Sequence, residues 1–174
     1  MNTPPDSSSK TAPCTGGRLV TVSHGPDETR AIGEAIGAGA TAGYVVLLVG
    51  PLGAGKTCLT QGILRGLGSD DYARSPTFVV MSQHRARLTL YHVDLYRLES
   101  AGEIDDLGLD EYLWGDGICV VEWAEKAPGL FPEEHLRIDL THIDESQRRI
   151  VITASGPIYR RVLAEVESTL ADGR

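Results

Sequence analysis

The stretch Gly50-Pro51-Leu52-Gly53-Ala54-Gly55-Lys56-Thr57 directly follows the apolar run YVVLLV at residues 44–49. It matches the pattern G-x-x-x-x-G-K-[ST], in which a glycine-rich turn joins a strand to a helix. The apolar run is rich in β-branched residues, as expected of a strand buried on both faces of a parallel sheet. Apolar residues after the stretch recur at helical spacing, at Leu59, Ile63, Leu64 and Leu67. The stretch therefore predicts a strand, a tight turn and a helix in immediate succession.

This junction has the chemistry of a phosphate-binding loop. Backbone N–H groups and the positive end of the helix dipole converge on one point, where the β-phosphate of a nucleotide can sit. Gly50, Gly53 and Gly55 permit positive φ angles and leave no Cβ in the way of the anion. We expect Lys56 to reach the β- and γ-phosphates and the Thr57 hydroxyl to ligate Mg²⁺. A chance match is expected in roughly one chain in a hundred of this length, so nucleotide binding is the favoured interpretation.

Length and composition indicate one domain. A chain of 174 residues can bury about 70% of its unfolded surface in a single core. Residues 1–17 are mainly Ser, Thr, Pro and Gly and are predicted to form a flexible tail, because they carry too few apolar side chains to compensate the entropy of ordering. Residues 18–174 are predicted to form a single domain that binds ATP. No signal peptide or bilayer-length apolar run is visible, which predicts a cytoplasmic protein without membrane contact.

The cysteines and the net charge indicate the redox compartment and the kinds of ligand that the protein can bind. Cys14, Cys58 and Cys119 show no paired spacing, which favours free thiols in a reducing compartment. The formal net charge is −8, and no run of Lys and Arg is longer than a pair. Because phosphate neutralisation supplies most of the non-specific affinity for nucleic acid, tight direct binding of nucleic acid is disfavoured. A basic patch assembled from dispersed residues by folding stays open.

The order of apolar segments predicts an α/β fold of the P-loop NTPase type, with three layers and a central mixed sheet. We expect strands at residues 18–23, 44–49, 77–82, 88–93, 117–121, 135–140 and 148–153. The sheet should be parallel near the phosphate loop and antiparallel toward the C-terminal strands. A helix should begin at Pro26 and end near Gly37, and short surface turns should occupy residues 100–113. A closing helix from Pro157 is predicted to bury the stripe Ile158, Val162, Val166 and Leu170.

Two acidic residues are candidates for the metal side of the site. A Mg²⁺–nucleotide site needs a carboxylate at the C-terminal end of a strand beside the loop. Asp94 follows one predicted strand and Glu122 follows another. Glu122 ranks first as the metal carboxylate because its strand is more uniformly apolar, and Asp94 ranks second, as the residue that orients the attacking water. A solvated residue just past a strand is the structural alternative for each.

Three further side chains have weaker signals. Thr77 lies in an extended segment after the loop helix and can sense the γ-phosphate as a switch threonine does, or can simply open a strand. Trp123 can stack on a ring or face a partner, although a half-buried core position is commoner. Arg97 can neutralise charge in the transition state, but a surface salt bridge is the commoner role. The five histidines show no metal-ligand spacing, and the lack of an N-K-x-D segment favours adenine over guanine.

Four segments, in this order and at these intervals, resemble the bacterial TsaE (YjeE) ATPases: Gly50 to Thr57, SPTF at 75–78, HVDLYRL at 92–98 and VEW at 121–123. The resemblance covers residues 18 to about 154. It implies a Mg²⁺-dependent ATPase required for threonylcarbamoyladenosine (t6A) modification of tRNAs that read codons starting with adenine. It also implies action on the TsaB–TsaD complex, which ATP hydrolysis resets between turnovers, so that tRNA is met only through that complex.

The resemblance also assigns residues by motif. It implies that ATP phosphates are bound by the loop residues Leu52, Gly53, Ala54, Gly55, Lys56 and Thr57, and that Mg²⁺ is held by Thr57 and Glu122. Thr77, Asp94 and Trp123 are implied to be functionally important, the first two with Lys56 and Glu122 in catalysis and Trp123 in nucleotide binding. Residues 23–29 resemble the adenine side of the site. Cys58 stands where the family often has a second threonine.

Two other functions fit the same loop. A small-molecule kinase would share it, but such kinases usually carry an arginine-rich lid, and the segment after Arg97 is acidic. A binding module that uses ATP as a structural switch would need no turnover. Loss of hydrolysis on replacing Glu122 distinguishes an ATPase from that switch.

Overall fold

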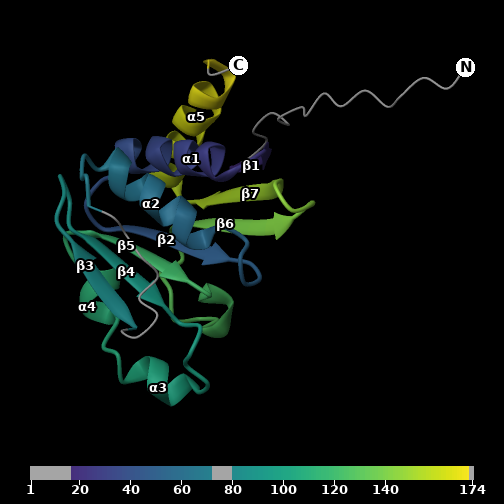
Figure 1. The fold of residues 1–174 in the computed structure, drawn as a ribbon. Coiled ribbons are helices and arrows are strands. Elements are labelled where there is room, and N and C mark those ends of the chain that lie inside the picture. Colours follow the sequence, from purple (N-terminus) through teal and green to yellow (C-terminus); the bar gives the residue numbers. More distant parts are fainter. Residues whose placement is uncertain (1–16, 72–79, 173–174) are drawn as a thin grey trace, which may run out of the picture.

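The computed structural model describes residues 17–71 and 80–172. These residues form a seven-stranded sheet with the strand order β1-β7-β6-β2-β5-β4-β3, shown in Figure 1. The strands are β1 Arg18–Ser23, β2 Tyr44–Val49, β3 Met81–His84, β4 Leu90–Asp94, β5 Ile118–Glu122, β6 His135–His142 and β7 Arg148–Ser155. Of the strand predicted at 77–82, residues 77–79 lie outside the described residues.

The sheet is mixed in the way that the sequence predicts. The central strand β2 runs parallel to both β5 and β6, and β4 runs parallel to β5. Toward the chain's C-terminal strands, β6, β7 and β1 pair antiparallel. At the other edge, β3 and β4 form the expected antiparallel hairpin. The predicted fold class is therefore confirmed, with the parallel strands gathered around the glycine-rich loop.

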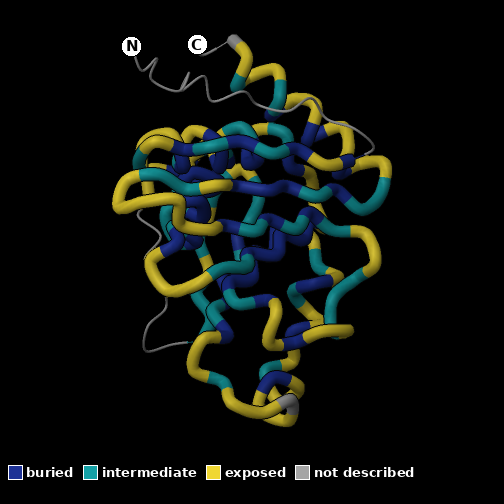
Figure 2. The backbone as a smooth tube through the Cα atoms, turned by 90° about the vertical axis from the view of Figure 1, so that its right-hand side faces the viewer, coloured by how far each residue is buried: buried dark blue, intermediate teal, exposed yellow. Residues whose placement is uncertain are grey.

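Helices cover both faces of the sheet. Three of them, α1 Pro26–Gly39, α2 Lys56–Gly66 and α5 Pro157–Asp172, pack on one face and share a buried apolar cluster with it. The other face is covered over β2, β5 and β4 by α3 Ala101–Asp105, α4 Asp110–Leu113 and the 3₁₀ helix η1 Ala124–Lys126. Figure 2 shows buried residues concentrated along the strands and exposed residues in the outer loops. None of the helices in the described ranges is both long and apolar enough to span a membrane.

Two details of the prediction are wrong. The segment 100–113 does form short helices, but Ile104, Leu109 and Leu113 are buried in the second core rather than lying on the surface. On α5, Val162 and Val166 are buried as predicted, but Ile158 is 54% exposed and Tyr159 is buried in its place. The Tyr159 ring packs against Tyr44 at 4.3 Å between centroids, and its hydroxyl accepts a hydrogen bond from the Val45 N–H at 3.0 Å. These contacts decide which face of the helix points inward.

Glycines bring α1 and α2 into backbone contact. A Cβ placed on Gly62 of α2 would lie 2.1 Å from the carbonyl oxygen of Arg30, and one on Gly33 of α1 would lie 2.3 Å from that of Leu59. No real Cβ tolerates such a distance from a backbone atom, so a side chain here must separate the helices. This close packing fixes α2, whose first turn carries Lys56 and Thr57.

We expect Gly62→Ala to lower the free energy of unfolding by about 1–3 kcal/mol, because the added methyl group overpacks a rigid contact. The matched control is Gly102→Ala in α3, where an added Cβ meets nothing within 4 Å. That variant should be neutral or slightly more stable, since alanine favours a helix by up to about 1 kcal/mol over glycine. Urea unfolding followed by circular dichroism measures both. Equal stability of the two variants would contradict the close-packing account.

Candidate functional site

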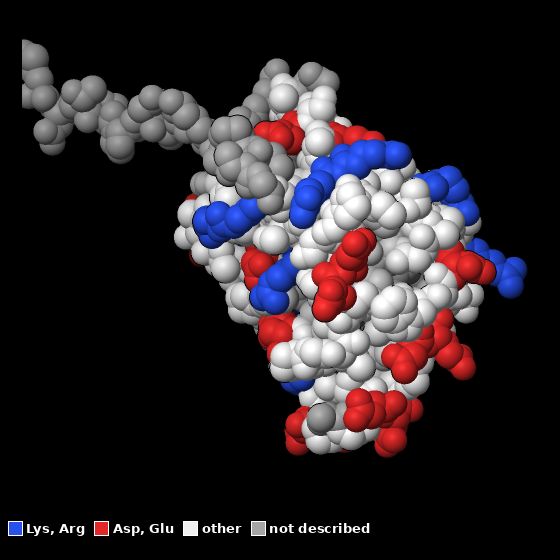
Figure 3. All heavy atoms as spheres, turned by 180° about the vertical axis from the view of Figure 1, so that it is seen from behind, with Lys and Arg blue, Asp and Glu red and all other residues white. Residues whose placement is uncertain are grey.

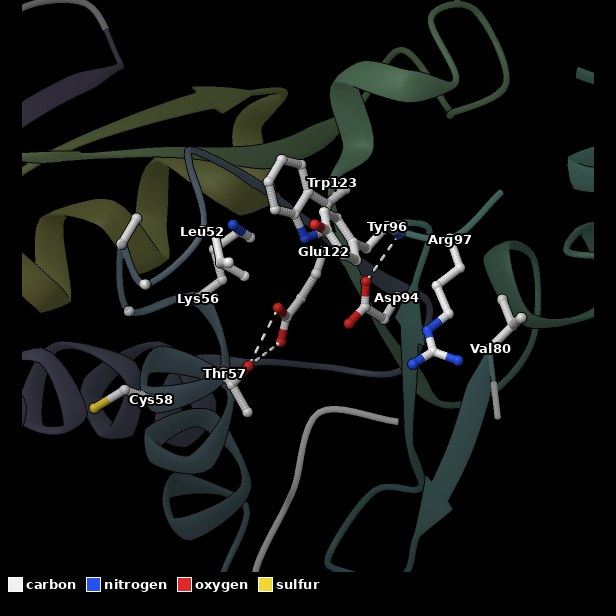
Figure 4. A pocket seen from close by; sticks show the side chains of 13 residues that line it. Leu52, Lys56, Thr57, Cys58, Val80, Asp94, Tyr96, Arg97, Glu122 and Trp123 are labelled. Carbon is white, nitrogen blue, oxygen red and sulfur yellow. Dashed lines mark hydrogen bonds between the residues drawn. The ribbon is translucent and has the colours of Figure 1, made fainter. Parts of the chain in front are cut away.

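A cavity of about 430 Å³ opens at the C-terminal ends of β2, β5 and β4, the end of a parallel sheet where ligands bind in such folds. Its lining includes the glycine-rich loop and side chains from three other segments: Leu52, Gly53, Ala54, Gly55, Lys56, Thr57, Cys58, Val80, Asp94, Tyr96, Arg97, Glu122 and Trp123. Figure 4 shows these side chains around the opening. The predicted loop residues from Leu52 to Thr57 are brought together here with Asp94, Arg97, Glu122 and Trp123, whereas Thr77 lies outside the described residues.

The loop owes its shape to glycine. Gly53 has φ +75° and Gly55 has φ +103°, values that residues with a side chain rarely adopt. A Cβ on Gly50 would lie 2.3 Å from the carbonyl oxygen of Leu140 on the neighbouring strand β6. Gly55 is the N-cap of α2, so the turn ends with the helix N-terminus directed at the cavity. The first-turn N–H groups and the helix dipole form an anion site at this point.

Lys56 is held by its own loop. Its ammonium donates to the carbonyl oxygens of Gly50 at 2.6 Å and Pro51 at 3.0 Å, and it lies 3.8 Å from the centroid of the Trp123 ring. Burial lowers the pKa of Lys56 below its ordinary value, while the charge of Glu122 acts in the opposite sense. To contact a phosphate, the ammonium must exchange these carbonyls for phosphate oxygens.

Trp123 closes one side of the cavity. It has φ +60°, the single positive φ of a non-glycine residue among those described, and its ring packs on Tyr96 at 4.9 Å. The ring is partly buried and contacts Lys56 on the cavity side. Trp123 thus packs half-buried against the second apolar cluster, as one of the predicted alternatives has it, and also lines the cavity. Its cation–π contact with Lys56 was not predictable from spacing.

The Thr57 hydroxyl meets the Glu122 carboxylate, as the metal prediction requires. Thr57 Oγ1 donates to Glu122 Oε1 at 2.9 Å and lies 3.2 Å from Oε2, and the carboxylate is 3% exposed. A hydroxyl and a carboxylate are the hard oxygen donors that Mg²⁺ prefers. No group of three or more His, Cys, Asp or Glu suited to a metal occurs among the described residues. The pair thus fits a Mg²⁺ ion that takes its other ligands from phosphate and water.

Asp94 lies beside Glu122 because β4 and β5 pair in parallel with these two residues in register. Its Oδ1 accepts a hydrogen bond from the Tyr96 N–H at 2.9 Å, and the side chain borders the cavity. Arg97 stands at the rim on the same side (Figure 4). Asp94 and Arg97 therefore both border the cavity, and the role of Arg97 stays a prediction.

His92 begins the segment HVDLYRL that carries part of the family resemblance, but no role in the site is predicted for it from the sequence. Its imidazole is fully buried, and Nε2 lies 2.8 Å from Oε1 of Glu122. The sequence signal was a polar residue in the middle of the apolar strand LYHV, two positions before Asp94. Its place between apolar strand residues indicates that His92 is buried, but no neighbouring residue in the sequence indicates that Glu122 is its partner.

The predicted adenine side, residues 23–29, is not part of the cavity lining. It adjoins the cavity through Cys58, whose Sγ lies 3.2 Å from the carbonyl oxygen of Pro26. Ser23 and Thr29 are buried and hydrogen-bonded to each other at 2.7 Å between their hydroxyl oxygens. Burial raises the pKa of the Cys58 thiol, which keeps it neutral beside the loop.

Charged side chains separate along the molecule. On the face in Figure 3, acidic residues gather at the end where α3 lies, and basic residues gather toward the α5 end. The basic side chains visible there are interrupted by acidic and uncharged ones. The formal net charge of the whole chain is −8, and the weak affinity for nucleic acid that this charge indicates stays a prediction.

The fold and the glycine-rich loop together define an α/β protein of the P-loop NTPase-like class. Residues 23–150 match the model of the family described as "Threonylcarbamoyl adenosine biosynthesis protein TsaE". The chain belongs to this TsaE family, and the resemblance inferred from its four motifs is confirmed.

Individual relatives agree with the family match. The TsaE protein of Bacillus subtilis (strain 168) is 42% identical over 142 residues, covering 81% of this chain and 89% of the relative. That of Treponema pallidum (strain Nichols) is 39% identical over 131 residues, covering 75% and 97%. The crystal structure of Bacillus subtilis YdiB superposes with a TM-score of 0.75 at 36% identity, covering 87% of this chain and 95% of YdiB.

Proposed function

We propose that this chain is a Mg²⁺-dependent ATPase that serves t6A modification of tRNA by acting on the TsaB–TsaD complex. The observation that carries the proposal is the contact between Thr57 Oγ1 and Glu122 Oε1 at 2.9 Å, at the N-terminus of the loop helix and beside the cavity. It brings a strand-end carboxylate to the hydroxyl that follows the loop lysine. Membership of the TsaE family, whose description names t6A biosynthesis, supports the pathway.

Each residue of the site has its own role in the proposed hydrolysis of ATP. The N–H groups of the loop and of the first turn of α2 bind the phosphates. The Lys56 ammonium leaves the carbonyl oxygens of Gly50 and Pro51 and binds the phosphate oxygens. Thr57 and Glu122 hold Mg²⁺, which when bound neutralises charge on the phosphate oxygens. Asp94, next to Glu122 in register, orients the water that attacks the terminal phosphate. Thr77 is proposed as the sensor of that phosphate.

The rim of the cavity supports a partner-dependent reaction. Leu52 at the tip of the loop is 72% exposed, and Tyr96 beside Trp123 is 49% exposed. Two large apolar side chains left in solvent at the mouth of a site are well placed for a protein that covers it. TsaB and TsaD are the proposed partners, with tRNA bound by that complex and not by this chain. The proposal includes a cytoplasmic location and one domain at 18–174. Of the tail predicted at 1–17, residues 1–16 lie outside the described residues, and the prediction is wrong for Gly17, which is buried and accepts a hydrogen bond from the Ala154 N–H at 2.7 Å.

Steady-state ATP hydrolysis, measured for the chain alone and after adding purified TsaB–TsaD, tests this proposal. We expect a slow rate alone, a clear increase with the complex, and loss of both on omission of Mg²⁺ or in Lys56→Ala. Hydrolysis that TsaB–TsaD leaves unchanged would contradict the partner role. Phosphate transfer to a panel of small acceptors would instead favour a kinase, and nucleotide binding without any turnover would favour a switch.

A further inference from the structure

We propose that His92 is a positioning residue that fixes the Glu122 carboxylate for the metal ion. The inference rests on the proposed function, in which Glu122 and Thr57 hold Mg²⁺. It concerns a side chain that lines no part of the cavity and acts only through Glu122.

The carboxylate of Glu122 is held from two sides. Thr57 donates from α2, and His92 donates from β4, where Nε2 lies 2.8 Å from Oε1. A carboxylate accepts hydrogen bonds and cannot donate them, so the imidazole carries its proton on Nε2. The Thr57 hydroxyl is itself a proposed metal ligand, whereas His92 is a donor to Glu122 that the metal would not use. The His92 donor lies on β4, which pairs in parallel with β5, the strand that ends in Glu122, and this pairing fixes the imidazole beside the carboxylate.

The other imidazole nitrogen, Nδ1, indicates that the hydrogen bond to Glu122 is what a polar side chain contributes at this buried position. Nδ1 of His92 is the one buried side-chain nitrogen or oxygen without a hydrogen-bond partner among the described residues. An unpaired buried polar atom is unfavourable, and an apolar side chain in the same strand would avoid it. Within the described part of the chain, the single hydrogen bond that offsets this is the one to Glu122. The imidazole therefore serves the carboxylate rather than a wider network.

The size of the effect follows from other metal sites. Residues that hydrogen-bond a metal ligand fix its orientation, and their loss typically weakens metal affinity about 10–100-fold. Losing the His92 N–H would free Glu122 to rotate and leave a buried carboxylate with one donor fewer. The binding of the nucleotide phosphates by the loop does not involve His92. A variant of His92 should therefore bind Mg²⁺ more weakly while it keeps its affinity for the nucleotide.

The test compares His92→Asn with His92→Gln. The glutamine amide nitrogen reaches about as far as Nε2 and can still donate to Glu122, whereas the asparagine amide ends near the position of Nδ1 and cannot. Calorimetry would measure the affinity for ADP with Mg²⁺ and with EDTA, and thermal unfolding would measure stability. His84→Asn is the matched control, because His84 on the adjacent strand β3 contacts Ser82 and not Glu122.

We expect His92→Asn to reduce the Mg²⁺-dependent gain in ADP affinity about 10–100-fold and to leave the affinity in EDTA unchanged. His92→Gln should recover most of the gain, and His84→Asn should retain all of it. An unchanged gain in His92→Asn would overturn the inference while leaving the proposed function intact. Equal losses with and without Mg²⁺, accompanied by a lower melting temperature, would also overturn it, because they indicate a structural role. A wild-type chain without any Mg²⁺-dependent gain would overturn the proposed function itself.

Discussion

Replacing Glu122 by glutamine is expected to reduce Mg²⁺-dependent ATP hydrolysis by at least about 100-fold, the scale found when one preorganised electrostatic contact to a reacting group is removed. The change keeps the volume of the side chain and an oxygen that can accept from Thr57 and His92, which now contact Oε1. It removes the negative charge that a divalent cation requires. The fold should survive, because the buried hydrogen bonds have a substitute acceptor.

The matched control for that variant is Glu111→Gln, an exposed acid on α4 that lies outside the cavity lining. It should hydrolyse ATP at the wild-type rate, both alone and with TsaB–TsaD. Steady-state phosphate release at several Mg²⁺ concentrations measures both variants. If Glu122→Gln hydrolysed ATP normally while Asp94→Asn did not, the assignment of the two acids would be reversed. If neither variant lost activity, the cavity would not be the site of hydrolysis.

Replacing Lys56 by methionine is expected to reduce ATP hydrolysis by about 100–1,000-fold, because it removes the one ammonium that can contact the phosphates inside the cavity lining. Methionine keeps an unbranched apolar side chain against Trp123 and avoids the void that alanine would leave. Burial of the charged ammonium costs stability and lowers the pKa of Lys56, whereas its hydrogen bonds to the Gly50 and Pro51 carbonyls contribute stability. Methionine removes both contributions, so we expect the melting temperature to change little.

Lys126→Met is the matched control for charge removal. Lys126 is not part of the cavity lining, although its ammonium donates to the carbonyl oxygen of Tyr96, which is. Measured without TsaB–TsaD, this variant should hydrolyse ATP normally. Phosphate release and thermal unfolding of the two variants, measured together, separate a catalytic effect from a folding effect. Wild-type hydrolysis by Lys56→Met would exclude a direct role of the ammonium in the reaction.

The parts of the site that the sequence predicts are those set by local chemistry. Gly50, Gly53 and Gly55 can be predicted as loop residues because the phosphate-loop pattern is eight residues long and its tight turn requires glycine. Asp94 and Glu122 can be assigned because each follows an apolar strand, and the parallel pairing of β4 with β5 places them side by side. The mixed sheet is predictable for the same reason, since apolar runs and alternating runs indicate parallel and antiparallel strands.

The parts that the sequence misses depend on contacts between distant segments. The hydrogen bond from His92 to Glu122 spans 30 residues and exists because two strands pair in one register. The contact of Lys56 with Trp123 depends on the left-handed backbone at Trp123, which no residue pattern indicates. On α5, periodicity indicates a helix but does not decide whether Ile158 or Tyr159 faces inward, and the packing of Tyr159 against Tyr44 decides it.

A crystal structure of the chain with Mg²⁺ and a non-hydrolysable ATP analogue tests the central claim most directly. The account predicts that the phosphates lie at the N-terminus of α2, with the metal held by Thr57 and the Glu122 carboxylate. It also predicts that the Lys56 ammonium has left the carbonyls of Gly50 and Pro51 for the phosphate oxygens. A nucleotide bound elsewhere, or a metal distant from Thr57 and Glu122 with Lys56 still on those carbonyls, would contradict it.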